Sequence, residues 1–288
     1  MSDPTMPGAA PPRGLADVLR VRAAERAAAP LVTFYDDATG ERIELSGATF
    51  GNWVAKTANL LVDGLGAQPG DRVALALPPH WQTAVWLFAC WSAGLVAAPV
   101  PHPLPSAPDE EATAATVAGA DVLAVTEADL PRALAAGGAA EVVGLSLHAL
   151  GGPLGDAPAG ITDYAADIRA YGDQFAPYAP VDPDAPALHV MSVTFTGAEV
   201  TAQAVSFVSK TGLDSSTRVL TMVPYHTVEG LLTGLLAPII AGGSIVITRN
   251  IDNTDKAALE RRISLEHVTA VAGVPGWDPP SGSVYGLP

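Results

Sequence analysis

The chain has 288 residues, 49% of them hydrophobic, and a mean hydropathy of +0.28, so it can bury one large core or two ordinary ones. Only 16% of the residues are charged, yet the formal net charge is -15, which excludes a broad surface for nucleic acid or anionic membranes. The single cysteine, Cys90, lies in an apolar run and cannot form an internal disulfide. It indicates a buried, inert thiol.

Residues 1–14 are rich in Pro, Ala and Gly, so we expect a disordered tail that carries neither a secretory signal nor a membrane anchor, and hence a cytoplasmic protein. Beyond it, apolar residues at helical spacing alternate with short apolar runs that suit buried strands. The predicted helices cover residues 15–29, 49–65, 81–93, 164–171, 227–240 and 255–266, with Thr49 as the cap of the second. The predicted strands cover residues 31–35, 42–45, 72–77, 95–100, 122–126, 142–147, 187–193, 219–223, 244–248 and 268–274.

This alternation predicts an α/β protein with mainly parallel sheets flanked by helices. A segment rich in Pro and Asp at residues 176–186 has the composition of a linker. We therefore expect a first α/β portion over residues 15–175, a second over 187–275, and a C-terminal tail over 276–288. Three tryptophans follow helical spacing and indicate core packing rather than a binding pocket, and these are Trp81, Trp86 and Trp91.

Six stretches, taken in order, carry a family resemblance. They are residues 48–53, 70–78, 92–100, 214–224, 235–247 and 267–275. In this order and spacing the chain resembles the adenylate-forming, or AMP-binding, superfamily, which includes acyl-CoA synthetases, luciferases and peptide-synthetase adenylation domains. Within that superfamily it is similar to a short group from high-GC bacteria.

The resemblance implies the N-terminal portion of the adenylate-forming fold, without the barrel subdomain and the C-terminal lid domain. It also implies a chemistry in which a carboxylate attacks the α-phosphate of ATP and gives an acyl-adenylate and pyrophosphate. Because two anions must come together, cations and backbone amides have to surround the phosphates. ATP or AMP with magnesium is therefore the cofactor set to expect if nucleotide binding persists.

The family's phosphate loop, Tyr-Thr-Ser-Gly-Thr-Thr-Gly-x-Pro-Lys-Gly, is laid on residues 191–200. The residues at positions able to contact phosphate are Ser192, Thr194, Thr196 and Gly197. Val200 stands in place of the lysine, and Glu199 adds a negative charge that raises the cost of binding phosphates. The nearest lysine, Lys210, belongs at the far end of the next helix. The segment is either a structural strand-to-helix connection or a degenerate loop that still binds nucleotide.

A second family motif, with an aromatic residue and a histidine between a proline and a glycine, resembles residues 224–230. The resemblance implies substrate contacts for Tyr225, His226, Thr227 and Gly230. Counted without a gap, Thr227 takes the place of the family's histidine, and His226 lies one residue early. These side chains can instead cap the following helix or bond locally. No pair of histidines has zinc-ligand spacing, so we expect no metal site.

Loss of the loop lysine and of the lid leads us to expect a catalytically degenerate relative, kept as a binding or assembly module. One alternative is an adenylating ligase or half-ligase that a separately encoded C-terminal partner completes. Another is a small-molecule binder that uses the cleft near Gly197 and Gly230. Surface that a barrel would cover favours a homo-oligomer or a separately encoded protein partner, with neither nucleic acid nor membrane.

Overall fold

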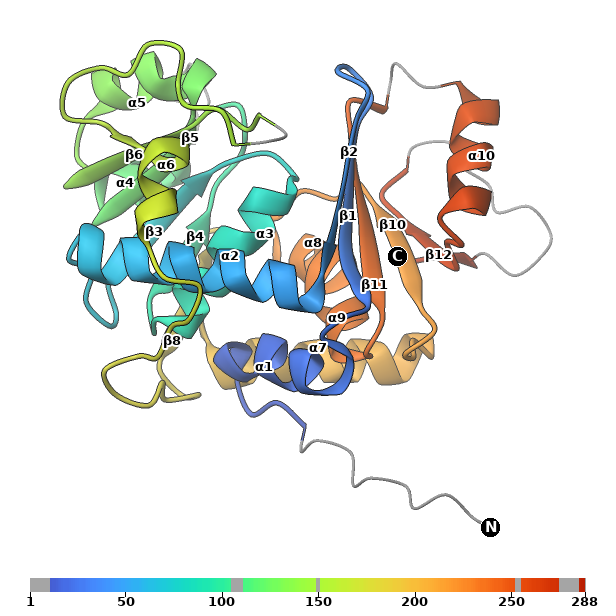
Figure 1. Ribbon diagram of the computed structural model, residues 1–288. Coiled ribbons are helices and arrows are strands. Elements are labelled where there is room, and N and C mark those ends of the chain that lie inside the picture. The colour runs from blue at the N-terminus through green and yellow to red at the C-terminus, as the bar shows by residue number, and fades with distance from the viewer. Residues whose placement is uncertain (1–10, 105–110, 149–150, 252–254, 275–284, 288) are drawn as a thin grey trace.

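The computed structural model describes residues 11–104, 111–148, 151–251, 255–274 and 285–287. They form two mainly parallel sheets with helices packed between and around them (Figure 1). This architecture confirms the predicted α/β class. The expected tail over residues 1–14 falls outside the described residues up to residue 10.

The helices follow the apolar periodicity of the sequence. They are α1 (Leu15–Arg26), α2 (Gly47–Asn59), α3 (Trp81–Ser92), α4 (Glu111–Ala118), α5 (Leu130–Ala136), α6 (Tyr164–Asp167), α7 (Gly197–Thr211), α8 (Val228–Leu231), α9 (Ala237–Ile240) and α10 (Lys256–Leu265). Short π-helical segments, Leu60–Gly64 and Leu232–Leu236, continue α2 and join α8 to α9. The predicted cap of α2 is wrong: Ser46 Oγ accepts a hydrogen bond from the backbone N–H of Thr49 at 3.1 Å, so Ser46 caps the helix.

The strands fall into a six-stranded and a seven-stranded sheet. In chain order they are β1 (Pro30–Asp36), β2 (Glu41–Ser46), β3 (Arg72–Ala76), β4 (Val96–Pro99), β5 (Val122–Thr126), β6 (Glu141–Leu145), β7 (Thr162–Asp163), β8 (Pro186–Val190), β9 (Val193–Thr196), β10 (Arg218–Thr221), β11 (Ser244–Arg249), β12 (Ala270–Ala272) and β13 (Tyr285–Gly286). The first sheet has the order β13-β12-β10-β11-β1-β2, and the second has the order β7-β6-β5-β3-β4-β8-β9. Every pair of described strands is parallel except the hairpins β1–β2 and β8–β9.

Each sheet takes strands from before and after residues 176–186. Val32 on β1 lies opposite Ile245 on β11, and Ala97 on β4 lies opposite Leu188 on β8. Buried apolar strands pair wherever both of their faces can be covered, whatever their separation in the chain. Within the expected C-terminal tail, β13 adds to the first sheet beside β12.

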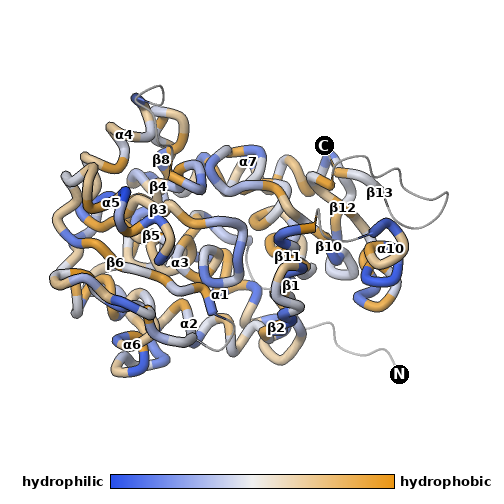
Figure 2. Tube along the Cα trace, turned by 90° about the horizontal axis from the view of Figure 1, so that it is seen from above, coloured by the Kyte–Doolittle hydropathy of each residue, from blue (hydrophilic) through white to orange (hydrophobic). Residues whose placement is uncertain are grey.

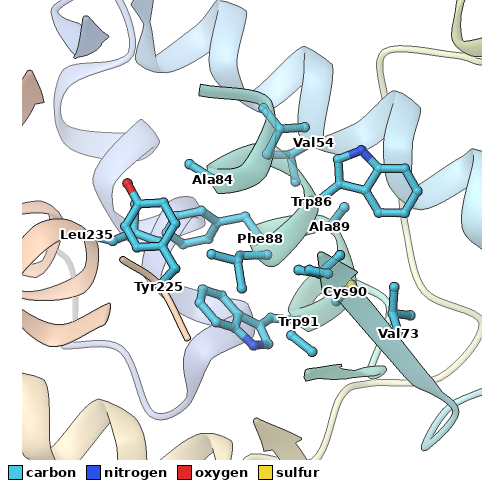
Figure 3. Close-up of a cluster of buried hydrophobic side chains, with 14 of the residues drawn as sticks. Val54, Val73, Ala84, Trp86, Phe88, Ala89, Cys90, Trp91, Tyr225 and Leu235 are labelled. Atoms are coloured by element: carbon cyan, nitrogen blue, oxygen red, sulfur yellow. The ribbon is translucent and has the colours of Figure 1, made fainter. Parts of the chain in front are cut away.

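One hydrophobic core joins the two sheets through α3 (Figure 3). The predicted core tryptophans are confirmed, because Trp81, Trp86 and Trp91 are at most 2% exposed. Cys90 is also fully buried, as predicted, and burial raises the pKa of its thiol.

The outer elements mix hydrophilic and hydrophobic residues along their length, as α10 does in Figure 2. That helix buries Leu259 and Ile263 and turns most of its other side chains outward. None of the described helices combines the length and the apolar character needed to cross a bilayer.

Candidate functional site

The segment expected to hold phosphate is a β-hairpin followed by a helix. Strands β8 and β9 pair in antiparallel fashion, with Val190 opposite Val193, so Met191 and Ser192 alone connect them. Their φ angles of 49° and 64° are those of a tight two-residue turn of type I′. A phosphate loop instead surrounds an anion with several consecutive backbone amides. Two residues are too few to do this.

The hairpin also separates the expected phosphate ligands. Strand β8 runs parallel to β4, and β9 returns along it, so Ser192 lies at the carboxyl edge of the sheet and Gly197 at the amino edge. Four residues of strand extend about 13 Å. Ser192 and Gly197 therefore cannot contact the same phosphate group.

The amides at the start of α7 already have acceptors within the chain. The Glu199 N–H donates to Thr196 Oγ1 at 3.1 Å, and the Thr196 N–H donates to Glu199 Oε2 at 2.8 Å, which completes a capping box. The Gly197 N–H donates to the Ala185 carbonyl at 3.2 Å, and the Ala198 N–H donates to the Pro183 carbonyl at 2.7 Å. An anion at this helix start would have to displace these bonds.

Two basic side chains close to this segment in the sequence, Lys210 and His189, do not supply the positive charge that the family's loop lysine would bring. Lys210 lies in the last turn of α7, about 20 Å from the start of the helix at 1.5 Å per residue. The Thr194 hydroxyl bonds to Nδ1 of His189 at 2.8 Å. Desolvation, helped by the charge of Arg72, lowers the pKa of His189, so this imidazole is neutral at physiological pH.

The second motif, residues 224–230, forms the connection from β10 to α8. Thr227 caps α8, since its Oγ1 accepts a hydrogen bond from the Gly230 N–H at 3.0 Å. Tyr225 is 3% exposed and packs in the core beside Leu235 (Figure 3), and burial raises the pKa of its phenol. A Cβ on Gly230 would lie 2.0 Å from the Pro224 carbonyl oxygen, so the turn requires glycine here. His226 is half-buried.

Gly197 is the one expected site residue that lines a large cavity of about 520 Å³ at the amino edge of the seven-stranded sheet. The cavity was not predicted from the sequence, because the composition of residues 176–186 does not show which helices this segment crosses. The concentration of prolines was the available signal, since proline stiffens a segment that spans other elements.

A second cavity, of about 440 Å³, lies at the amino edge of the six-stranded sheet and is lined by arginines. Three of these arginines already bind acceptors within the protein. Arg218 and Arg42 reach the two oxygens of Glu266 at 2.6 Å and 2.9 Å, and Arg22 donates to the Gly243 carbonyl. Burial acts to raise the pKa of Glu266, but hydrogen bonds from Tyr35, Arg218 and Arg42 outweigh it and lower that pKa. Among the described residues, no group of His, Cys, Asp and Glu has an arrangement for a metal ion.

Two mainly parallel sheets around shared helices define the N-terminal domain of acyl-CoA synthetases and related adenylate-forming enzymes. The chain belongs to the AMP-binding enzyme family, whose family model matches residues 19–277.

Known relatives agree with this assignment. A protein of Mycobacterium tuberculosis, itself named only by a protein family, is 42% identical over 242 residues, which cover 84% of this chain and 90% of that protein. A feruloyl-CoA synthase of Amycolatopsis is 30% identical over 77% of this chain, which spans only 42% of the synthase. The N-terminal domain of FACL13 from Mycobacterium tuberculosis has the same fold, with a TM-score of 0.73 at 18% identity over 92% of this chain and 63% of that chain.

Proposed function

We propose that the chain is a catalytically degenerate member of the AMP-binding family that serves as a binding or assembly module in the cytoplasm. The turn at Met191 and Ser192 supports this proposal most strongly, because it replaces a long phosphate loop with two residues. The single, fully buried cysteine is consistent with a cytoplasmic site of action.

Electrostatics supports the same proposal. Attack of a carboxylate on ATP brings negative charges together, and loss of a single placed hydrogen-bond donor slows comparable reactions by about 100-fold to 1000-fold. Here the amides at the start of α7 are occupied, Lys210 is distant, and Glu199 adds a negative charge. A chain of net charge -15 has no general excess of cations to compensate.

Assembly with another protein is supported by the exposed tip of the hairpin. Met191 is 76% exposed and Val193 is 50% exposed, and exposed apolar side chains that form a contiguous patch can mark a contact with a second protein. Another copy of this chain or a separately encoded protein can cover them. A partner that brings a cation to this edge would make the chain half of a ligase, which is the alternative function.

The test incubates pure protein with ATP, magnesium and a panel of aromatic, fatty and amino acids, and measures pyrophosphate. We expect release no faster than with heat-denatured protein. Robust release by the pure chain overturns the proposal. Release that requires a second protein co-purified from native extract replaces it with the half-ligase.

A further inference from the structure

The cavity of about 520 Å³ lies at the amino edge of the seven-stranded sheet, at the opposite edge from the turn at Met191. Its walls come from α1, α2, the end of α3 and residues 175–187, and apolar side chains dominate them. Among these are Leu15, Leu19, Val54, Trp91, Phe175 and Val181. Its volume is within the range of about 300–1000 Å³ that small-molecule sites have.

Residues 171–186, here called the strap, line one side of this cavity and are fixed at their first end to α2. Figure 1 shows this segment passing beside α2. Asn59 Nδ2 donates to the carbonyls of Gly172 at 3.0 Å and Gln174 at 2.9 Å. Lys56 Nζ donates to the carbonyl of Tyr171. This end of the strap therefore cannot move without breaking side-chain hydrogen bonds to α2.

The second end of the strap is fixed to α7 and α3. The Gly197 and Ala198 N–H groups hold the carbonyls of Ala185 and Pro183, and Trp91 Nε1 donates to the Ala187 carbonyl at 3.0 Å. Prolines at positions 177, 180, 183 and 186 restrict the backbone between the two ends. The strap is thus held in place before any ligand binds, so binding beneath it avoids the entropy cost of ordering a flexible loop.

The charges at the rim balance. Arg20 Nη2 pairs with Asp17 Oδ1 at 2.8 Å, and Arg13 and Asp182 supply one further charge of each sign. Such a site does not select a polyanion. It suits a molecule that is apolar over most of its surface and carries at most one charged group.

We propose that the cavity beneath the strap binds a small, mainly apolar molecule at the amino edge of the sheet, away from the turn at Met191 and Ser192. The proposal goes beyond the function proposed above and holds whether or not the chain adenylates anything. The occupant is a free small molecule, since strap, helices and sheet edge enclose the space from several sides.

Gly51 provides the decisive variant. It lies within α2 and lines the cavity, and a Cβ there meets nothing within 4 Å. Gly51→Phe therefore places a ring in the cavity without a backbone clash, and it also removes a residue of poor helix propensity. Gly51→Ala is the conservative control, and Ala24→Phe adds the same ring at an exposed position of α1.

The probe is 1-anilinonaphthalene-8-sulfonate, followed by fluorescence and displaced by decanol or decanoate. We expect Gly51→Phe to weaken its binding by about tenfold or more, while Gly51→Ala and Ala24→Phe stay within about twofold of the parent chain. Native mass spectrometry should find one probe molecule per monomer. Unchanged probe binding in a folded Gly51→Phe chain overturns the proposal, as does probe bound only to a dimer.

A second pair of variants keeps the test decisive if Gly51→Phe fails to fold. Asn59→Ala removes the two bonds that fix the first end of the strap, whereas Asn52→Ala changes an exposed residue of the same helix. We expect Asn59→Ala to weaken probe binding by about threefold to tenfold and Asn52→Ala to leave it unchanged. Equal affinities for the two variants contradict a site beneath the strap.

Discussion

The two ends of the β8–β9 hairpin differ in the space that they leave for a ligand. At the carboxyl edge, Met191 and Ser192 close the chain in a tight exposed turn. At the amino edge, Gly197 is buried, its amide is used, and a large apolar cavity opens beside it. Ligands of parallel α/β sheets bind outside the carboxyl ends of the strands. Membership of the AMP-binding family therefore fixes the fold of this chain, but it does not by itself place a ligand at the carboxyl edge of the sheet.

A substitution in the connection after β10 should have the largest effect on stability, because the backbone there leaves no room for a side chain at Gly230. Gly230→Ala places a Cβ 2.0 Å from the Pro224 carbonyl oxygen. We expect the free energy of unfolding, measured in urea, to fall by about 3 kcal/mol. Gly51→Ala, where the new Cβ meets open space, should instead raise it by up to about 1 kcal/mol. Similar changes in both variants would mean that residues 224–230 are loosely packed.

The residue that caps α3 is buried, whereas the residue that caps α7 is partly exposed, so protonation should affect stability at the cap of α3. His80 is 0% exposed, and its Nδ1 accepts a hydrogen bond from the Gln82 N–H at 3.1 Å. Burial, and then the charge of Arg249, lowers the pKa of His80 well below its usual value. The folded chain therefore keeps His80 neutral at pH values where the unfolded chain protonates it.

Stability should consequently fall as the pH drops below about 6.5, by at most about 1.4 kcal/mol per pH unit for this group. Urea unfolding at several pH values should show that slope. His80→Phe should flatten it, with His102 and His189, whose pKa values burial also lowers, retaining part of it. A slope unaffected by His80→Phe would contradict this assignment.

Removal of the capping box at the start of α7 should have a smaller effect on the free energy of unfolding. Thr196→Ala removes the acceptor for the Glu199 N–H, and we expect a loss of about 1 kcal/mol in the free energy of unfolding. Ser209→Ala, an exposed change in the same helix, should stay within about 0.5 kcal/mol of the parent chain. If Thr196→Ala costs nothing, the helix start is not closed as described.

The smallest expected effect is a gain at the hairpin turn. Ser192 has a φ of 64°, a left-handed conformation that glycine adopts without strain. Ser192→Gly should therefore raise the free energy of unfolding by about 0.5–1 kcal/mol, as thermal and urea unfolding can measure. Ser216→Gly, in an exposed loop with ordinary φ, is the matched control. A loss of stability in Ser192→Gly would show that the serine side chain supports the turn.

Apolar periodicity predicted most helices and strands and the core position of α3, because those features depend on residue type at regular spacing, but it missed the short helices α4 and α5. It did not reveal the turn at residues 191–192, since Met-Ser lacks the Asn-Gly pattern that marks type I′ turns. It also placed the cap of α2 at Thr49, since either hydroxyl residue suits that position and local geometry selected Ser46. The cavity beneath the strap depends on segments far apart in sequence, which periodicity does not relate.

Hydrogen exchange of the segment from Val190 to Ala204, with and without millimolar magnesium-ATP, tests the central claim most directly. Because the amides of Gly197, Ala198 and Glu199 already have acceptors within the chain, we expect identical exchange in both conditions. Slower exchange of these amides when ATP is present would show that the segment binds phosphate, and would contradict the proposal that the chain is catalytically degenerate.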